Sequence, residues 1–440
     1  MYMGLLFLVS GRGGSAVAGL HLSTISGPAN SAQIYPGQTR PYRPTIVLNP
    51  TRVKPAPQRS PSVILSRMEN RSEHSTWIEV DLTAIENNVG LIRQQTGVRV
   101  MAIVKADGYG HGAVPVARAA LQGGASWLGV ARLEEALELR QAGLEAPILL
   151  LGYTPPGRLE QAIASNLSLA AWTEDQVEAA AAAAKSLGTA ARLHLKLDTG
   201  MNRLGAPAEA AVQLARWMAE MPGVHLEGVF THFARSDEAD LTHTRGQVSL
   251  FRQALAELQA AGLRPALAHA ANSAASLRLP EASFDMVRVG IAMYGLHPSP
   301  DCPLPEGYRP AMSWKAALSH VKTLPAGQGI SYNYEYFTQA QERIGTLPVG
   351  YADGLRRKLP NQVLIRGQKV PAVGRVCMDQ VMLRLDDAPG ARAGDEVVII
   401  GEQAGQRISA EEVASRWGTI NYDVVCGIGR RVPRLYNSQA

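Results

Sequence analysis

Lys105 stands where an apolar run gives way to a glycine-rich one. Residues 101–105 read Met-Ala-Ile-Val-Lys, and residues 106–112 read Ala-Asp-Gly-Tyr-Gly-His-Gly. A lysine at the end of a buried strand is partly desolvated, so its pKa falls and its amine can form an imine with a carbonyl compound. The glycines let the backbone approach a ligand closely, and Tyr109 offers a hydroxyl beside it. The pattern indicates an imine-forming lysine, and the alternative is a solvated lysine beside a turn.

A second group of polar residues follows another apolar run. Residues 194–205 read His-Leu-Lys-Leu-Asp-Thr-Gly-Met-Asn-Arg-Leu-Gly. Lys196 and Asp198 are too polar for a domain interior unless they have partners. Arg203 lies where a guanidinium could hold a carboxylate through two parallel hydrogen bonds.

Histidines occur in two further short motifs, Thr-His-Phe-Ala at 231–234 and His-Ala-Ala-Asn-Ser at 269–273. Each histidine by itself is more often a structural residue than a ligand. No second histidine or carboxylate completes a usual metal-ligand spacing around either one. The sequence therefore predicts no metal site.

Arg288 interrupts the apolar run Met-Val-Arg-Val-Gly-Ile at 286–291. A buried arginine is costly unless it is paired, so we expect Arg288 to face a ligand or His269. Gly290 and the amide that follows it lie after the last expected strand, where barrels commonly bind phosphate. The hydroxyl of Ser273 could join the same phosphate site.

The elements that position these residues alternate along the chain. From about residue 98, short β-rich runs alternate with Ala-, Leu- and Glu-rich stretches of helical apolar spacing. Eight such repeats in about 200 residues are typical of a (β/α)8 barrel, whose active sites lie at the carboxyl ends of the strands. A doubly wound sheet is the alternative, but no Gly-x-Gly-x-x-Gly turn follows the first strand. The expected strands are 98–104, 127–131, 148–152, 168–172, 192–198, 226–233, 266–272 and 286–295, and the helices include 133–142, 174–187, 206–221 and 244–261.

After about Pro310 the pattern becomes that of a mostly β domain. The expected strands are 316–323, 343–349, 362–365, 370–376, 381–385 and 396–400, interrupted by one helix at 410–417. Thr173 with Gln176 and Ser409 with Glu412 have the spacing of capping boxes. The expected fold class is α/β: a (β/α)8 barrel at 85–306 followed by a mostly β C-terminal domain at 307–440. Residues 76–84 would supply an N-terminal strand that pairs with the β domain.

Composition excludes several function classes. The net charge is +5, but residues 1–68 hold seven basic and no acidic residues, which leaves −2 for residues 69–440. The folded part is near neutral, so we expect no nucleic-acid partner. No apolar run is long enough to span a membrane. Three cysteines without paired spacing favour the cytoplasm.

The N-terminal extension, residues 1–75, is rich in Pro, Ser, Gly and Arg. Its composition indicates disorder, or a translation start placed too early with Met68 as the true start. An organelle-targeting segment and a secretory signal are the alternatives.

Together these motifs resemble the ordered signature blocks of alanine racemases. The barrel blocks are 105–112, 196–205, 231–234, 269–273 and 288–295. The β domain adds Gly-Ile-Ser-Tyr at 329–332, Pro-Val-Gly-Tyr-Ala-Asp-Gly at 348–354, Gly-Arg-Val-Cys-Met-Asp-Gln at 374–380 and Ile-Asn-Tyr at 420–422. One block would be weak support, whereas about nine in order over residues 76–437 are specific.

The resemblance implies an isomerase that interconverts L-alanine and D-alanine with pyridoxal 5'-phosphate and supplies D-alanine for peptidoglycan. Lys105 would carry the cofactor and serve as the base for D-alanine, and Tyr332 would serve as the base for L-alanine. A tyrosine near its usual pKa is a poor base at neutral pH, so positive charge or hydrogen bonds must assist it.

The resemblance also implies the other site roles. Arg288 would hydrogen-bond the pyridine nitrogen, and His232 would stack on the ring. Arg203 and the backbone N–H of Met378 would hold the substrate carboxylate, and Tyr351 would stand at the entrance. The implied phosphate contacts are Tyr109, Ser273, Gly290, Ile291 and Tyr422.

In the family, Tyr332 and Met378 reach the barrel of a partner subunit, which implies a homodimer with shared active sites. Tyr334 and Tyr336 follow where relatives commonly have glycine, but the interval to Tyr351 favours Tyr332 as the base. Lys196 matches a position that is often carbamylated in the family.

Three alternatives remain beside alanine racemase. A broad-specificity amino-acid racemase would share the fold. A decarboxylase with the same cofactor should carry an acid where Arg288 stands. A non-catalytic pyridoxal-phosphate-binding protein would be a lone barrel, and the β domain with Tyr332 and Met378 argues against it.

Overall fold

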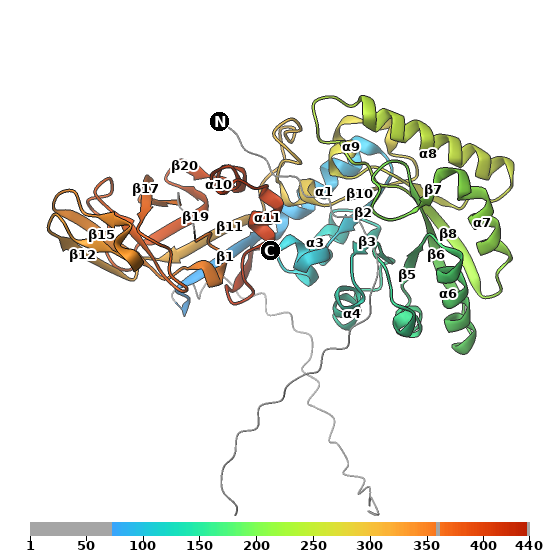
Figure 1. Ribbon diagram of the computed structural model, residues 1–440, viewed down its shortest axis with the longest axis horizontal. Helices are drawn as coiled ribbons and strands as arrows, with labels where there is room; N and C mark the ends of the chain where they lie inside the picture. The colour runs from blue at the N-terminus through green and yellow to red at the C-terminus, as the bar shows by residue number, and fades with distance from the viewer. Residues whose placement is uncertain (1–72, 358–360, 438–440) are drawn as a thin grey trace, which may run out of the picture. The chain divides into compact units, whose positions relative to one another are not determined.

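The computed structural model describes residues 73–357 and 361–437. The extension expected over residues 1–75 therefore lies, apart from its last three residues, outside the described residues. Within the described ranges the chain forms a helix-wrapped parallel barrel followed by a mostly β region (Figure 1).

The barrel strands are parallel and follow the order β10-β2-β3-β4-β5-β6-β8-β9, with the short β7 paired only with β6. Between β9 and β10 two backbone hydrogen bonds nearly close the barrel, Asp285 N to Ala268 O at 3.0 Å and Arg288 N to Ala271 O at 2.9 Å. Most strand residues are buried, as expected for parallel strands covered on both faces. The predicted barrel is confirmed. The strands are β2 (Arg99–Ile103), β3 (Trp127–Val130), β4 (Ile148–Leu150), β5 (Ser168–Ala171), β6 (Ala191–Asp198), β7 (Ala206–Pro207), β8 (Val224–Phe230), β9 (Leu267–His269) and β10 (Met286–Val289).

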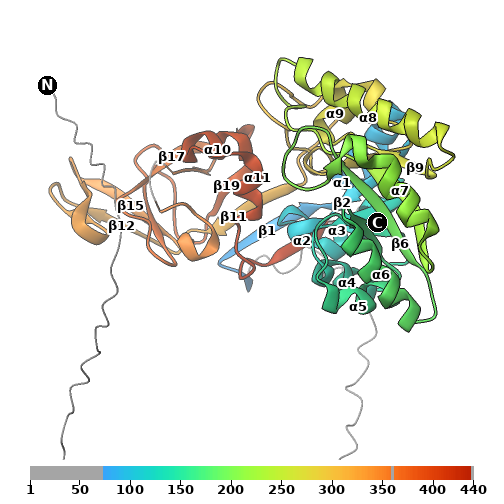
Figure 2. The ribbon, with the colours of Figure 1, turned by 45° about the vertical axis from the view of Figure 1, so that its right-hand side comes forward.

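Helices lie on the outside of these strands (Figures 1 and 2). The helix of residues 174–186 shows why: it buries Val177, Ala180, Ala181 and Ala184, a spacing that forms one apolar stripe. The helices are α1 (Leu82–Thr96), α2 (Lys105–Tyr109), α3 (Ala113–Gln122), α4 (Leu133–Gln141), α5 (Leu159–Ala164), α6 (Glu174–Ser186), α7 (Ala211–Glu220), α8 (Thr242–Ala260) and α9 (Ser273–Arg278).

Local signals explain some of the helix ends, with one correction. Asp81 caps α1 by accepting from Ala84 N at 3.0 Å. Ser409 accepts from Glu412 N at 3.1 Å, which is one of the two hydrogen bonds of the predicted capping box, and the Glu412 carboxylate accepts from Lys369 at 2.9 Å. The capping box predicted for α6 is wrong, because the Thr173 side chain makes no cap hydrogen bond. Instead Gln176 accepts from Trp172 N at 2.9 Å, one residue before the expected cap.

The last two barrel strands are shorter than predicted. The backbone leaves β9 after His269, and α9 begins at Ser273. The residues expected to continue β10 form the 3₁₀ helix η5 (Ile291–Tyr294). Apolar composition alone does not distinguish a buried strand from the buried turn that follows it.

The C-terminal region is a ten-stranded sheet in the order β12-β15-β18-β17-β16-β19-β11-β1-β21, with β20 paired with β19. Although β1 begins the described chain, it pairs antiparallel with β11 and parallel with β21. The run predicted as one strand at 316–323 is divided between β11 and β12. The strands are β1 (Thr76–Asp81), β11 (Met312–Ala317), β12 (His320–Leu324), β15 (Glu342–Leu347), β16 (Gln362–Ile365), β17 (Gln368–Val373), β18 (Val381–Arg384), β19 (Glu396–Gln403), β20 (Gln406–Ile408) and β21 (Arg434–Asn437).

Two helices interrupt this β region, α10 (Ala410–Trp417) and α11 (Asn421–Cys426), where the sequence predicts only the first. The hairpin β13 (Gly329–Ile330) and β14 (Tyr336–Phe337) lies apart from the main sheet. Within residues 73–357 and 361–437, no helix has the length and apolarity that a membrane crossing requires.

Hydrogen bonds join the barrel helices to the segments that follow. Asn88 of α1 donates to Met293 O at 3.0 Å and to Arg309 O at 2.8 Å, and Asn421 of α11 donates to His297 O at 2.8 Å. These bonds tie helices α1 and α11 to residues 293–309, the segment that connects the barrel to the β region.

Candidate active site

The backbone after β2 forms an unusual left-handed turn. From Ala106 to Gly110 all five residues have positive φ, between 53° and 77°. Left-handed conformation costs roughly 1–2 kcal/mol for each non-glycine residue. Such strain persists only where the surroundings hold it, and it is frequent at ligand sites. The turn presents Lys105 at its start and Tyr109 near its end.

Three side chains brace this turn. Glu135 of α4 accepts from Ala106 N at 2.7 Å, and Asp107 accepts from Ala113 N at 2.9 Å. Arg434 of β21 donates to Gly110 O at 3.1 Å. Gly110 has no room for a side chain, because a Cβ there would lie 2.2 Å from Val425 O.

The amine of Lys105 is held toward its neutral form. Burial lowers its pKa, and the charges of Arg203 and Arg288 lower it further, while Glu135 raises it. A lysine in such surroundings is a better nucleophile and a better proton acceptor at neutral pH than a solvated one.

A buried set of hydrogen-bond donors lies beside the lysine turn. Gly290 N donates to Ser273 Oγ at 3.0 Å, and a Cβ on Gly290 would lie 2.5 Å from the Tyr109 hydroxyl. The rings of Tyr109 and Tyr422 have centroids 6.1 Å apart, and burial raises the pKa of both phenols. These hydroxyls therefore stay protonated and can donate to an anion. Ile291, whose amide follows Gly290, is buried.

Arg288 is buried and held by acceptors from the neighbouring strands. It donates to His269 Nδ1 at 3.0 Å and to His232 Nδ1 at 3.2 Å, and three backbone carbonyls accept from it, those of Thr231, His269 and Ala270. Burial lowers its pKa to about 9, which leaves the guanidinium charged at neutral pH. Arg288 therefore does face His269, one of the two partners expected.

Positive charge is in excess at this end of the barrel. The pKa of Lys196 is lowered to about 8, first by burial and then by Arg288, and Arg203 acts in the same direction. Nearby Asp198 accepts backbone hydrogen bonds from residues 200–202. Arg203 and Arg288 thus act on both lysines, and this excess of positive charge favours a ligand with more than one anionic group.

The three site candidates of the β region lie on its surface. Tyr332 is 66% exposed, Met378 53% and Tyr351 42%. Their loops pack together, since Tyr351 N donates to Cys377 O at 3.1 Å and Ser331 Oγ donates to Arg375 O at 2.7 Å. In the part of the chain that the structure describes, no hydrogen bond or ring contact joins these three side chains to the barrel residues above.

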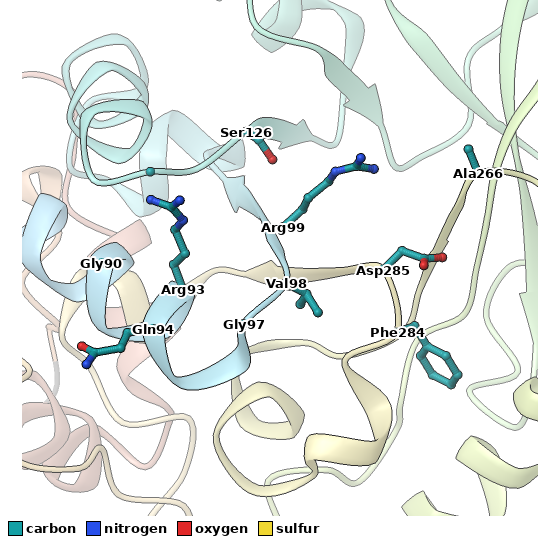
Figure 3. A pocket seen from close by; sticks show the side chains of 11 residues that line it. Gly90, Arg93, Gln94, Gly97, Val98, Arg99, Ser126, Ala266, Phe284 and Asp285 are labelled. Carbon is teal, nitrogen blue, oxygen red and sulfur yellow. The ribbon is translucent and has the colours of Figure 1, made fainter.

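A hollow of about 1090 Å³ lies at the opposite, amino end of the barrel strands. Figure 3 shows Arg93 of α1, Arg99 of β2 and Asp285 around it. None of the candidate residues lines this hollow, so it is separate from the site.

Two braces were not identified from the sequence. Glu135 lies at the third position of α4, where a capping-box glutamate was a usable signal. Arg434 acts on a residue 324 positions away, and no local pattern indicates that contact.

Known proteins match both regions of the chain. The family model of the alanine racemase N-terminal domain matches residues 80–298, and that of the alanine racemase C-terminal domain matches residues 311–436. A relative from Symbiobacterium thermophilum named alanine racemase is 50% identical over 367 residues, 83% of this chain and 97% of that protein.

Solved structures give the same picture. An alanine racemase from Bacillus anthracis with bound L-Ala-P has a TM-score of 0.78 at 41% identity and covers 83% of this chain and 96% of its own. A histidine racemase from Leuconostoc mesenteroides has a TM-score of 0.77 at 29% identity, over 83% and 98%. Because both family models and a half-identical relative span the barrel and the β region, the chain belongs to the alanine racemase family of isomerases.

Proposed function

We propose that the chain interconverts L-alanine and D-alanine, with pyridoxal 5'-phosphate as its cofactor and one base on each face of the α-carbon. The observation that carries the proposal is the pair of arginines at the carboxyl end of the barrel, Arg203 and Arg288, whose positive charges lower the pKa of both Lys105 and Lys196. A cofactor phosphate and a substrate carboxylate together supply the negative charge that balances these cations.

The donor set beside Lys105 fits the cofactor. The hydroxyls of Tyr109, Ser273 and Tyr422 and the amides of Gly290 and Ile291 would hold its phosphate. Lys105 would bind its carbonyl carbon, Arg288 would donate to its ring nitrogen, and His232 would lie against its ring. When bound, the cofactor supplies the electron sink that acidifies the α C–H of the substrate.

Proton transfer needs two groups, because inversion removes a proton from one face and returns one to the other. Lys105, with its lowered pKa, would act on the face that serves D-alanine. Tyr332 of the partner subunit would act on the face that serves L-alanine, so we propose a homodimer. Arg203 and the backbone N–H of the partner's Met378 would hold the carboxylate, and the partner's Tyr351 would narrow the entrance.

Lys196 would complete the site as a carbamate. Its pKa of about 8 leaves part of the amine unprotonated at neutral pH. The ammonium form first loses one proton, and the neutral amine then adds carbon dioxide and releases a second, so a cation becomes an anion that steadies Arg203. In ¹³C-bicarbonate, NMR should show a carbamate carbon in the wild type and in Lys185→Gln, an exposed-lysine control, but not in Lys196→Gln. A wild-type spectrum without that carbon would contradict the modification.

The direct experiment is a racemisation assay on the purified, cofactor-loaded chain. We expect alanine to be the best substrate and Lys105→Ala to abolish both turnover and the imine absorbance. A broad-specificity amino-acid racemase is the second candidate function, because a histidine racemase has a similar fold. Faster turnover of histidine, lysine or arginine than of alanine would favour that candidate, and cofactor binding without any racemisation would favour a binding protein.

We place this activity in the cytoplasm, where it would supply D-alanine for peptidoglycan. The low cysteine count of three supports a reducing compartment. Fractionation of the source cells with an antibody to the chain tests the location.

A further inference from the structure

A line of buried hydrogen bonds leads from Arg288 across the barrel interior to a carboxylate. Arg288 Nη1 lies 3.0 Å from His269 Nδ1, and His269 Nε2 lies 2.9 Å from His194 Nδ1. His194 Nε2 lies 3.1 Å from Glu227 Oε2. Ser168 of β5 donates to the same carboxylate, and Arg192 of β6 lies 3.7 Å from its other oxygen.

The chemistry of the first donor fixes the direction of every bond in this line. A guanidinium can only donate, so His269 Nδ1 must accept and the proton of a neutral His269 must be on Nε2. That N–H donates to His194 Nδ1, so the proton of His194 is also on Nε2. The second N–H then points at Glu227. Each imidazole therefore turns its unprotonated nitrogen toward Arg288 and its N–H toward the carboxylate.

The barrel is shaped around these two rings. Both histidines are fully buried, and their ring centroids are 5.2 Å apart. Gly228 makes room for one of them, because a Cβ there would lie 2.3 Å from His194 Nδ1. The register between β6 and β8 also shifts next to His194.

Burial and nearby positive charges both disfavour the protonated form of the two rings. Burial lowers the pKa of His269, and Arg288, His194 and Lys196 lower it further. Burial also lowers the pKa of His194, against the opposing effect of Glu227, while Arg288 and Arg192 add to the lowering. Burial disfavours ionised Glu227, yet its hydrogen bonds from His194 and Ser168 hold the pKa of its carboxyl below the usual value.

Arg288 otherwise lacks a counter-ion. Within residues 73–357 and 361–437 no carboxylate forms an ion pair with it, and an uncompensated buried charge is costly. Glu227, whose side chain is 18% exposed, is the only carboxylate that the line of described hydrogen bonds reaches. Hydrogen bonds in series polarise one another, so its charge can stabilise the guanidinium at a distance.

We propose that Glu227 and His194 are positioning residues: through His269, they keep the Arg288 guanidinium charged and aimed at the ring nitrogen of the cofactor. The inference rests on the proposed function for that last clause only. The fixed tautomers and the remote counter-ion concern this chain's own side chains and can be measured without turnover.

Glu227→Gln is the variant to test, because it keeps an acceptor oxygen for His194 but removes the charge. Without its remote counter-ion Arg288 loses its proton at lower pH. The alkaline limb of the kcat profile, and the alkaline transition in the absorbance of the bound cofactor, should therefore move down by about one pH unit. We expect kcat to fall about tenfold and KM to change less than twofold, because the residue does not contact substrate. Glu257→Gln, on the outer helix α8, removes an equal charge and should leave the alkaline limb, the absorbance transition and kcat unchanged.

A second measurement uses the wild-type chain and needs no variant to fold. In ¹⁵N-histidine NMR, His194 and His269 should be neutral with the proton on Nε2 and should not titrate between about pH 6 and about pH 9. His232, whose Nδ1 also accepts from Arg288, should give a third signal of the same kind. The inference fails if His194 or His269 carries its proton on Nδ1 or titrates in this range, or if Glu227→Gln leaves the alkaline absorbance transition where it is in the wild type. Loss of racemisation with the NMR pattern intact would instead count against the proposed function alone.

Discussion

At the residue scale, the phosphate cradle depends on hydroxyl groups that the fold has already desolvated. Tyr109 is buried, stacks on Tyr294 with centroids 4.9 Å apart, and places its hydroxyl beside Gly290. Because burial raises the pKa of this phenol, the hydroxyl remains a donor across the physiological range. A donor fixed before the ligand arrives costs little further ordering when it binds.

Tyr109→Phe removes that donor and leaves the ring in place. A hydrogen bond to a charged group contributes about 1.5–3 kcal/mol, so the dissociation constant of pyridoxal phosphate should rise about tenfold to a hundredfold. Absorbance titration of the cofactor-free protein measures it. Tyr308→Phe is a matched control, because the buried Tyr308 hydroxyl has no hydrogen-bond partner within the described residues. Equal affinities for the two variants would remove Tyr109 from the cradle.

At the element scale, the left-handed turn after β2 is the feature that aims Lys105 and Tyr109 together. Ala106, Asp107 and Tyr109 adopt positive φ without being glycine. Glu135 of α4 stabilises the strained turn through its carboxylate. One oxygen accepts from Ala106 N, and the other accepts from Ala131 N at 2.8 Å and Arg132 N at 3.0 Å. One side chain thus ties the loops after β2 and β3 to each other.

Glu135→Gln should loosen that tie, because its amide group turns a donor toward backbone N–H groups. Leaving such groups unsatisfied costs about 1–3 kcal/mol, which denaturant unfolding of the cofactor-free protein would detect. The neighbouring Glu134→Gln is the control, since Glu134 makes an exposed ion pair with Arg158. If the two variants unfold at the same denaturant concentration, Glu135 does not brace the turn.

The sequence predicts an element well when the interactions that form it lie within a few residues of one another along the chain. The strand at 362–365 and the helix at 410–417 match the prediction, because alternation, capping and turn residues act within a few positions. The N-terminal strand predicted over 76–84 ends at Asp81, and α1 begins at the next residue. The rule that polar residues gather at strand ends also predicts the place of Lys105, whereas Lys196 and Arg288 lie within β6 and β10. Glu135, Arg434 and the line from Arg288 to Glu227 were not predicted, because each depends on contacts between distant segments.

At the scale of the whole molecule, one chain supplies only half of the proposed chemistry. The barrel holds Lys105 and the cofactor cradle, whereas Tyr332, Tyr351 and Met378 gather on an exposed surface of the β region. Tyr334, which is 61% exposed, lies on the same loop as Tyr332. Ser331, Asn333 and Tyr334 of this loop all have positive φ. An exposed aromatic patch on a strained loop is typical of an interaction surface.

Mixed dimers test whether two chains share each site. Suppose Lys105→Ala and Tyr332→Phe chains are each inactive, and are then unfolded, mixed in equal amounts and refolded together. Half of the dimers contain one chain of each kind. If each site takes Lys105 from one subunit and Tyr332 from its partner, one site of such a dimer has both bases and the other has neither. Since a closed two-fold dimer has two equivalent sites, the mixture should regain about a quarter of the wild-type activity. Sites contained within single chains would regain none, because every chain in the mixture lacks one base.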